Sequence, residues 1–237
     1  MQIDSSAPLL AFDTSTDTLS VALRHAGRVQ VHTGAGGAQA SATLIPLARA
    51  LLEQAGIRFG DLGAIVFGRG PGSFTGLRTA CAVAQGMAFG ARPGGLPVLP
   101  VDTLLAVAEE ARALHGTGQV VAAMDARMGE VYSCAYRYDE AAGRWQPGSG
   151  LSVAAPENVA VPAGWTLAGN ARAAYGERLG QGAASVAALP TAEALLRLAP
   201  ALAAAGGLVA AADALPLYIR DKVAKTTAER MAEKAAA

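Results

Sequence analysis

The residues best suited to chemistry form the run Asp13-Thr14-Ser15-Thr16, directly after the first predicted strand. A carboxylate followed by hydroxyl groups can hold a hydrated Mg²⁺ ion together with a phosphate group. The same side chains can instead hydrogen-bond to their own backbone and form a turn. On residue chemistry alone, the turn is favoured over the metal and phosphate site.

A glycine-rich segment at residues 68–76, GRGPGSFTG, is the second candidate for phosphate binding. Glycines allow backbone N–H groups to approach an anion, and the N-terminus of a following helix adds a favourable dipole. The segment does not match a P-loop, because Leu77 stands where that motif has Lys. It is closer to the dinucleotide-binding fingerprint, with Asp102 after the next strand, but its third glycine, Gly76, comes one position late. A dinucleotide-binding protein is therefore the less favoured interpretation.

The sequence lacks the residue patterns that a serine hydrolase or a histidine-ligated metal site requires. Ser73 does not fit a nucleophile elbow, because Pro71 and Thr75 stand where that motif requires glycine, and we expect a loop hydroxyl or a helix cap instead. The three histidines lack the spacing of a metal site or of a Ser-His-Asp triad; they are His25, His32 and His115. We expect no catalytic residue and no metal ligand.

Asp125 and Glu130 bracket a second predicted turn, with Arg127 between them. A local ion pair explains these charges as well as a functional role does. The position of Arg127 in this turn makes it a candidate interface residue.

Composition limits the class of protein. The chain has 237 residues with 19 Lys and Arg against 19 Asp and Glu, and this zero net charge argues against a protein whose main task is to grip a polyanion. Cys81 and Cys134 are isolated and are predicted to be small buried thiols in a reducing compartment. The N-terminus lacks a signal-peptide pattern, and no apolar stretch is long enough to cross a bilayer. We expect a cytoplasmic protein with no membrane contact.

Local patterns predict an antiparallel start followed by alternating strands and helices. Short β-prone runs bounded by turn residues predict strands, and apolar spacing of three and four residues that stops at glycine predicts helices. The expected strands cover residues 9–13, 18–27, 27–33, 61–67, 96–102, 119–125, 130–138 and 165–169. The expected helices cover residues 43–55, 75–89, 103–114, 171–179 and 191–205, with loops at 68–76 and 143–150 and a short strand or turn at 217–223.

This order of elements predicts two α/β halves of similar size. The boundary lies between residues 100 and 118. We divide the chain into an N-terminal subdomain, residues 1–104, and a C-terminal subdomain, residues 105–237, whose tail can pack back on the first.

The helix predicted at residues 75–89 is apolar nearly all round, with small residues at every fourth position. A ridge of small residues lets a partner helix approach closely, whereas the alternative is a helix sandwiched inside one subunit. We favour a partner surface formed by Gly76, Ala80, Val83, Ala84, Met87 and Ala88. On this hypothesis Ala84→Arg abolishes pairing and leaves the monomer folded.

Five segments carry a resemblance to a known family. They are LLAFDTSTDTLSVAL at residues 9–23, GRGPGSFTGLR at 68–78, AQGMAFG at 84–90, AAMDARMGEVY at 122–132 and PLYIRDKVA at 216–224. In these segments the chain resembles the TsaB (YeaZ) family of tRNA threonylcarbamoyladenosine biosynthesis proteins, which are glycoprotease-like. The resemblance implies an α/β fold of two actin/Hsp70/sugar-kinase-like subdomains, each with a mixed sheet and packed helices.

The resemblance also implies a scaffold function without catalysis of its own. Family members pair with a larger paralogue, TsaD, which carries the metal and transfers a threonylcarbamoyl group to the adenosine next to the anticodon of tRNAs reading codons that start with A. A small ATPase subunit, TsaE, joins the pair. The resemblance further implies a homodimer when the chain is alone and tRNA contact mainly through the partner. The alternative is an enzyme, either a nucleotide-dependent phosphotransferase or a glycoprotease-like hydrolase.

Matched residue by residue, Asp13, Thr14 and Ser15 correspond to the first phosphate loop of the superfamily. Ser15 replaces the glycine that ATP-using members prefer, which implies a weak or vestigial nucleotide site. Ala40 and Thr43 occupy the helix entry where the catalytic paralogue has its metal-binding histidines. The resemblance thus implies no cofactor of the chain's own, with ATP or ADP at a subunit interface. We expect solvent rather than tRNA around the basic tail residues Arg220, Lys222, Lys225, Arg230 and Lys234.

Overall fold

The computed structural model describes residues 3, 4 and 6–220, and its first half is built on a five-stranded mixed sheet. The strand order is β3-β2-β1-β4-β5, in which β1, β2 and β3 are antiparallel and β1, β4 and β5 are parallel. The antiparallel start is therefore confirmed. The strands are β1 (Leu9–Asp13), β2 (Thr18–His25), β3 (Arg28–Ala35), β4 (Ala64–Gly70) and β5 (Val98–Asp102).

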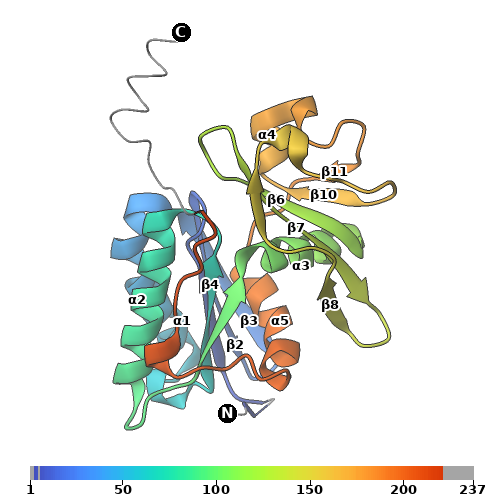
Figure 1. Ribbon diagram of the computed structural model, residues 1–237. Helices are drawn as coiled ribbons and strands as arrows, with labels where there is room; N and C mark the ends of the chain where they lie inside the picture. Colours follow the sequence, from blue (N-terminus) through green and yellow to red (C-terminus); the bar gives the residue numbers. More distant parts are fainter. Residues whose placement is uncertain (1–2, 5, 221–237) are drawn as a thin grey trace, which may run out of the picture.

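Helices cover both faces of this first sheet (Figure 1). Leu10 and Phe12 of β1 point to one face and pack against helices α1 and α2, whereas Leu9 and Ala11 point to the other face and pack against α5, as the two-residue period of a strand requires. Gly56 ends α1 in the left-handed conformation. The helices are α1 (Ala40–Ala55), α2 (Phe74–Ala91) and α5 (Ala192–Ala204).

A second mixed sheet forms the other half of the molecule. Its order is β11-β10-β6-β7-β8, and β9 also pairs with β7. Two mixed sheets with packed helices confirm the predicted fold class. The elements are β6 (Gln119–Asp125), β7 (Val131–Asp139), β8 (Arg144–Pro147), β9 (Ser152–Ala154), β10 (Thr166–Gly169), β11 (Ser185–Val186) and the short helix α4 (Ala171–Tyr175).

Helix α3 (Thr103–His115) joins the two halves because its residues enter two different cores. Ala106 packs with α5 and the first sheet, whereas Leu104 and Val107 pack with the second sheet. The chain then returns to the first half after residue 186: α5 packs on the first sheet, and Val209 forms an antiparallel bridge with Val98. The first half is therefore completed by residues from the C-terminal part of the chain.

Several boundaries differ from the predicted ones. The expected strand at 61–67 begins later and runs to Gly70, so the predicted loop at 68–76 shortens to residues 71–73. The predicted loop at 143–150 contains β8, and the predicted helix at 171–179 divides into α4 and a 3-10 turn. The 3-10 turns are Gly37–Gln39, Phe59–Asp61, Pro156–Asn158, Gly176–Arg178 and Ala211–Asp213.

The strand or turn predicted at residues 217–223 lies only partly within the described residues. Residues 217–220 form no strand, and residues 221–223 lie outside the described residues, as do Lys222, Lys225, Arg230 and Lys234. Among the described helices, we find none with the length and apolar character needed to span a bilayer.

Candidate functional site

The loop after β1 is closed by its own side chains. Ser15 donates hydrogen bonds to Asp13 Oδ1 from its backbone nitrogen, at 2.8 Å, and from Oγ, at 2.6 Å. Thr14 Oγ1 donates to the carbonyl of Gly76 at 2.8 Å, and all three residues of the loop are buried. These contacts confirm the self-bonded turn that residue chemistry favoured.

The glycines of residues 68–76 allow the start of α2 to press against this loop. A Cβ atom at Gly76 would lie 1.8 Å from the carbonyl oxygen of Thr14, and one at Gly68 would lie 1.8 Å from Asp13 Oδ2. Ser73 caps α2 by accepting a hydrogen bond from the backbone nitrogen of Gly76 at 3.4 Å, which confirms the predicted helix cap. The chain itself thus fills the space that the glycines leave open.

Asp13 is an isolated acid inside the protein. Its Oδ2 atom is buried with no hydrogen-bond partner among the described residues. Burial raises the pKa of Asp13 to about 6, against the opposing effect of the two hydrogen bonds from Ser15. Such a carboxyl group takes up a proton in mildly acidic solution.

A cleft of about 660 Å³ lies between the two halves. Its walls are loops at the ends of strands from both sheets, which is the usual place for a ligand site in α/β folds. Of the three residues predicted to bind nucleotide, Ser15 lines this cleft, whereas Asp13 and Thr14 lie behind it. The hydroxyl groups of Thr14 and Ser15 donate to atoms of the chain, so in this conformation neither hydroxyl is directed toward a ligand in the cleft.

Arg127 connects the two walls of the cleft. Its guanidinium contacts Asp17 Oδ2 of the first half at 3.0 Å and Asp125 Oδ2 of its own turn at 3.2 Å. The predicted local pair with Asp125 is confirmed, but Glu130 is bound by Arg220 from the C-terminal segment instead. Arg127 itself has a φ of 62°, in the left-handed region.

The turn that carries Arg127 is held by side chains distant in sequence. Tyr175 OH donates to Asp125 Oδ1 at 2.7 Å, and Asn170 Oδ1 accepts from the backbone nitrogen of Asp125 at 2.8 Å. Burial, together with the hydrogen bond to Asp125, raises the pKa of Tyr175 to about 12. No local pattern in the sequence points to Tyr175, Asn170 or Asp17, because only the folded chain brings them to this turn.

The small-residue ridge of α2 faces inward, which corrects the predicted partner surface. Gly76, Ala80, Ala84 and Ala88 are buried, and the three alanines pack in the core of the first half. Of the six predicted contact residues, Val83 and Met87 keep partial exposure. Ala84→Arg would place a guanidinium inside that core, so the expectation that this variant stays folded is wrong.

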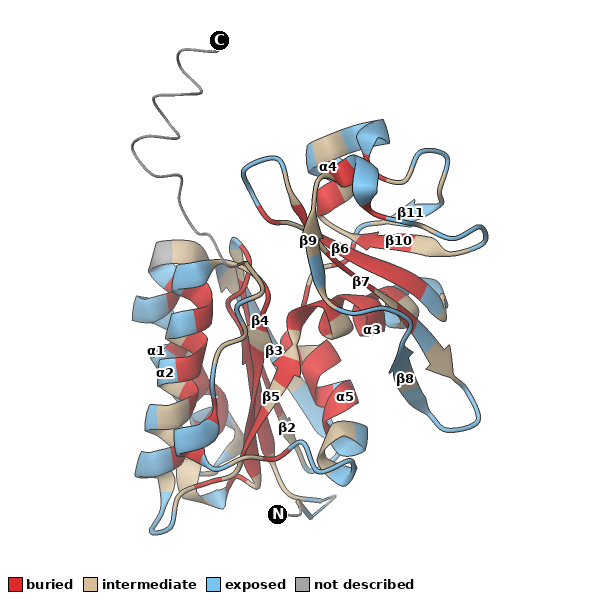
Figure 2. Ribbon diagram, in the orientation of Figure 1, coloured by how far each residue is buried: buried red, intermediate tan, exposed pale blue. Residues whose placement is uncertain are grey.

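The opposite side of α2 carries a second row of small residues, and this row is exposed. Ala82, Gly86 and Gly90 lie on it at four-residue intervals, and a Cβ atom added at either glycine would meet nothing within 4 Å. Phe89 on the same helix is 61% exposed, and Ile45 on α1 is 44% exposed. Figure 2 shows α1 and α2 side by side, with exposed residues along their outer side. The two rows have similar composition, so the sequence pattern could not decide which one faces the sheet.

Other reactive side chains are dispersed. Cys81 and Cys134 are free and buried, as predicted, and burial raises the pKa of both thiols. Within the described residues no group of three or more His, Cys, Asp or Glu side chains is placed to hold a metal ion.

Comparison with known proteins gives consistent matches along the chain. Residues 28–235 match the family model described as TsaD, tRNA N6-adenosine threonylcarbamoyltransferase. The chain is 37% identical over 226 residues to the tRNA threonylcarbamoyladenosine biosynthesis protein TsaB of Escherichia coli, covering 91% of this chain and 96% of the relative.

Solved structures agree with the sequence matches. YeaZ from Pseudomonas aeruginosa superimposes with a TM-score of 0.82 at 43% identity, covering 90% of this chain and all of that one. A second structure, described as an uncharacterized protein with similarity to peptidase YEAZ from Pseudomonas aeruginosa, has the same TM-score at 42% identity and the same coverage.

Proposed function

Because the chain belongs to the TsaB (YeaZ) family of tRNA threonylcarbamoyladenosine biosynthesis proteins, we propose that it serves this modification as a non-catalytic subunit of a TsaD-type threonylcarbamoyltransferase. The transfer acts on the adenosine next to the anticodon of tRNAs that read codons starting with A. The protein pairs with the catalytic subunit in the cytoplasm, and a TsaE-type ATPase joins the pair.

The observation that carries this proposal is the uncovered face of α2. Ala82, Gly86 and Gly90 let the backbone of a partner helix come close, and small residues at helix contacts shorten the distance between helix axes. Phe89 on α2 and Ile45 on the neighbouring α1 are exposed apolar side chains, and covering such side chains with a partner is favourable. The same face suits self-pairing when the partner is absent.

The division of labour follows from charge and from the site at Asp13. A chain with zero net charge leaves most of the grip on tRNA to its partner. Thr14 and Ser15 already donate their hydroxyl protons within the chain, so we assign ATP or ADP to a subunit interface rather than to Asp13. Ser73 is engaged as a helix cap, which supports a scaffold over a hydrolase.

The pathway is tested by depleting the protein in its host and measuring threonylcarbamoyladenosine in total tRNA by mass spectrometry. We expect the modification to fall on depletion and to return with the wild-type chain. An unchanged level of modification would refute the proposed function and would favour a nucleotide-dependent enzyme.

The pairing surface is tested with Gly86→Arg. Gly86 is exposed and a Cβ atom added there meets nothing within 4 Å, so we expect the monomer to keep its fold while the guanidinium blocks a partner helix. We expect loss of the complex with the TsaD-type subunit in size-exclusion chromatography with light scattering, and no recovery of tRNA modification. Ala142→Arg, at an exposed position between β7 and β8, is the matched control and should behave as wild type. A complex that survives Gly86→Arg would contradict the assignment of this face.

A further inference from the structure

A second pocket, separate from the cleft at Arg127, lies between α5 and the hairpin of β7 and β8. Its volume is about 580 Å³, which is large enough for a small organic molecule. It shares no lining residue with the cleft. The function proposed above does not use this pocket.

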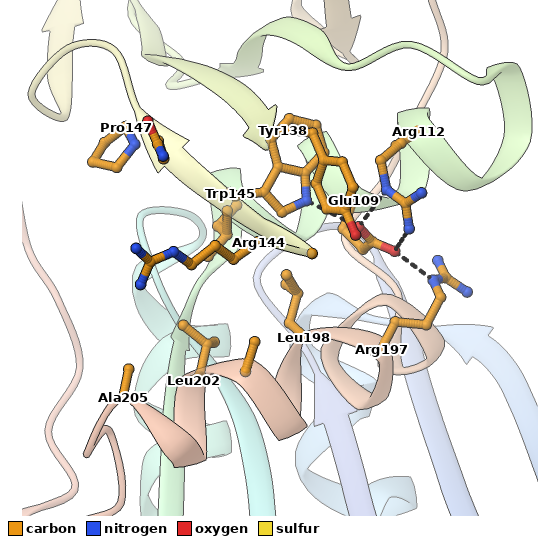
Figure 3. Close-up of a pocket in the computed structure, with 14 residues that line it drawn as sticks. Glu109, Arg112, Tyr138, Arg144, Trp145, Pro147, Arg197, Leu198, Leu202 and Ala205 are labelled. Atoms are coloured by element: carbon orange, nitrogen blue, oxygen red, sulfur yellow. Dashed lines mark hydrogen bonds and ion pairs between the residues drawn. The ribbon is translucent and has the colours of Figure 1, made fainter. Parts of the chain in front are cut away.

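One wall of the pocket is an indole ring held in a fixed orientation. Trp145 Nε1 donates to Glu109 Oε2 at 2.9 Å, and the ring meets Tyr136 and Tyr138 edge to face, at interplanar angles of 78° and 69°. Figure 3 shows Trp145 on one side and Leu198 and Leu202 of α5 on the other. An aromatic surface facing leucine side chains across a gap suits a flat apolar group.

The acid at the back of the pocket is fully engaged by protein groups. The Glu109 side chain is 3% exposed and binds Arg112 through two hydrogen bonds of 3.0 Å and Arg197 Nε through one of 3.0 Å. Arg197 also binds Glu110. The charges of the two guanidinium groups and the two carboxylates cancel. This network therefore fixes the side chains of the pocket wall and adds no net charge.

Arg144 supplies the surplus charge. Its side chain lines the pocket and has no side-chain partner among the described residues. Asp139, its neighbour in the strand register, directs its carboxylate to the backbone nitrogen of Ala142 and to Gln146 Nε2. Figure 3 shows the Arg144 guanidinium at the end of the pocket away from Glu109. A free guanidinium at the mouth of an apolar pocket suits a carboxylate or phosphate group.

We propose that this pocket binds a small molecule with a flat aromatic ring and one acidic group, the ring between Trp145 and the leucines of α5 and the acid on Arg144. Carboxylate and phosphate share the chemistry that Arg144 recognises. The ligand therefore belongs to the class of aromatic acids or aryl phosphates.

Isothermal titration calorimetry on the full chain tests this with three ligands that share one ring: 1-naphthoate, 1-naphthyl phosphate and the neutral 1-naphthalenemethanol. We expect at least one acid to bind one-to-one and the alcohol to bind about tenfold or more weakly, because a charge-assisted hydrogen bond is lost. The acid that binds more tightly identifies the preferred group. Absence of saturable binding by both acids, or equal affinity for the alcohol, would overturn the proposal.

Variants locate the binding. Arg144→Gln should lower the affinity for the acid to that for the alcohol. Ala201→Trp should abolish binding, because Ala201 is an exposed residue of α5 that lines the pocket and a large side chain there fills it. Ala204→Trp, exposed on the same helix outside this pocket, is the matched control and should bind as wild type. Binding that is unchanged in Ala201→Trp would place the ligand elsewhere and refute the assignment.

Discussion

At the scale of single residues, Asp13 links the stability of the chain to pH. Its pKa is raised from 3.8 to about 6 in the folded protein, so the folded state binds the proton more tightly than the unfolded state. The contribution of protonated Asp13 to the free energy of unfolding is full below about pH 4 and is lost as the pH rises through 6. The shift in pKa corresponds to a change of about 3 kcal/mol in that free energy.

Asp13→Asn keeps the shape of the side chain and removes this titration. We expect the variant to be more stable than wild type at pH 7.5, with a free energy of unfolding higher by up to about 3 kcal/mol. The difference should vanish near pH 4. Urea unfolding followed by circular dichroism across this range measures it. Asp213→Asn, at an exposed position, serves as control. A constant difference between Asp13→Asn and wild type at all pH values would show that Asp13 does not titrate as described.

Glu109 is the other acid on which the fold depends. Glu109→Leu removes the buried carboxylate that binds Arg112, Arg197 and the indole of Trp145, so Arg112 loses its carboxylate partner and Arg197 keeps only Glu110. We expect the free energy of unfolding to fall by about 3–5 kcal/mol in urea titration. Glu53→Leu breaks only the exposed pair with Arg49 and should change the free energy by less than about 0.5 kcal/mol. Equal effects of the two substitutions would refute a structural role for the buried network.

At the scale of elements, replacing glycine by alanine on α2 should have opposite effects on stability at two positions. Gly76→Ala forces a Cβ atom against the backbone of Thr14, and we expect the free energy of unfolding to fall by at least about 2 kcal/mol, because the backbone must shift to relieve this contact. Gly86→Ala meets no atom and should stabilise α2 by about 0.5–1 kcal/mol through reduced backbone entropy. Thermal unfolding of both variants measures the contrast. Stabilisation by Gly76→Ala would show that α2 does not rest on the loop after β1.

The sequence predicted the strands and helices with strong apolar patterns, and it located the turn at Asp13 and the cap at Ser73. It did not predict β8, because four residues between two glycines look like a loop until β7 supplies the neighbouring strand. It also placed the ridge of α2 on the wrong side. The pairing of Arg127 with Asp17 joins residues that are far apart in sequence, and no local pattern encodes such a contact.

At the scale of the whole molecule, the first half is not expected to fold without the C-terminal part of the chain. A fragment of residues 1–118 lacks α5, so the apolar side chains of Leu9, Ala11 and Val66 face solvent. We expect this fragment to show no near-ultraviolet circular dichroism signal and to bind a dye that reports exposed apolar surface. The chain ending at residue 220 keeps every element described and serves as the folded control. Dispersed amide resonances in the NMR spectrum of the 1–118 fragment would contradict this.

The return of α5 to the first sheet also sets an order of events during synthesis. The strands of that sheet end at Asp102, whereas the helix that covers their inner face begins at Ala192. At about 5–20 residues per second, the ribosome synthesises α5 about 5–20 s after the last of these strands. The half of the protein that is synthesised first is thus the last to be completed. Until α5 is synthesised, we expect chaperones to shield the apolar strands of this sheet.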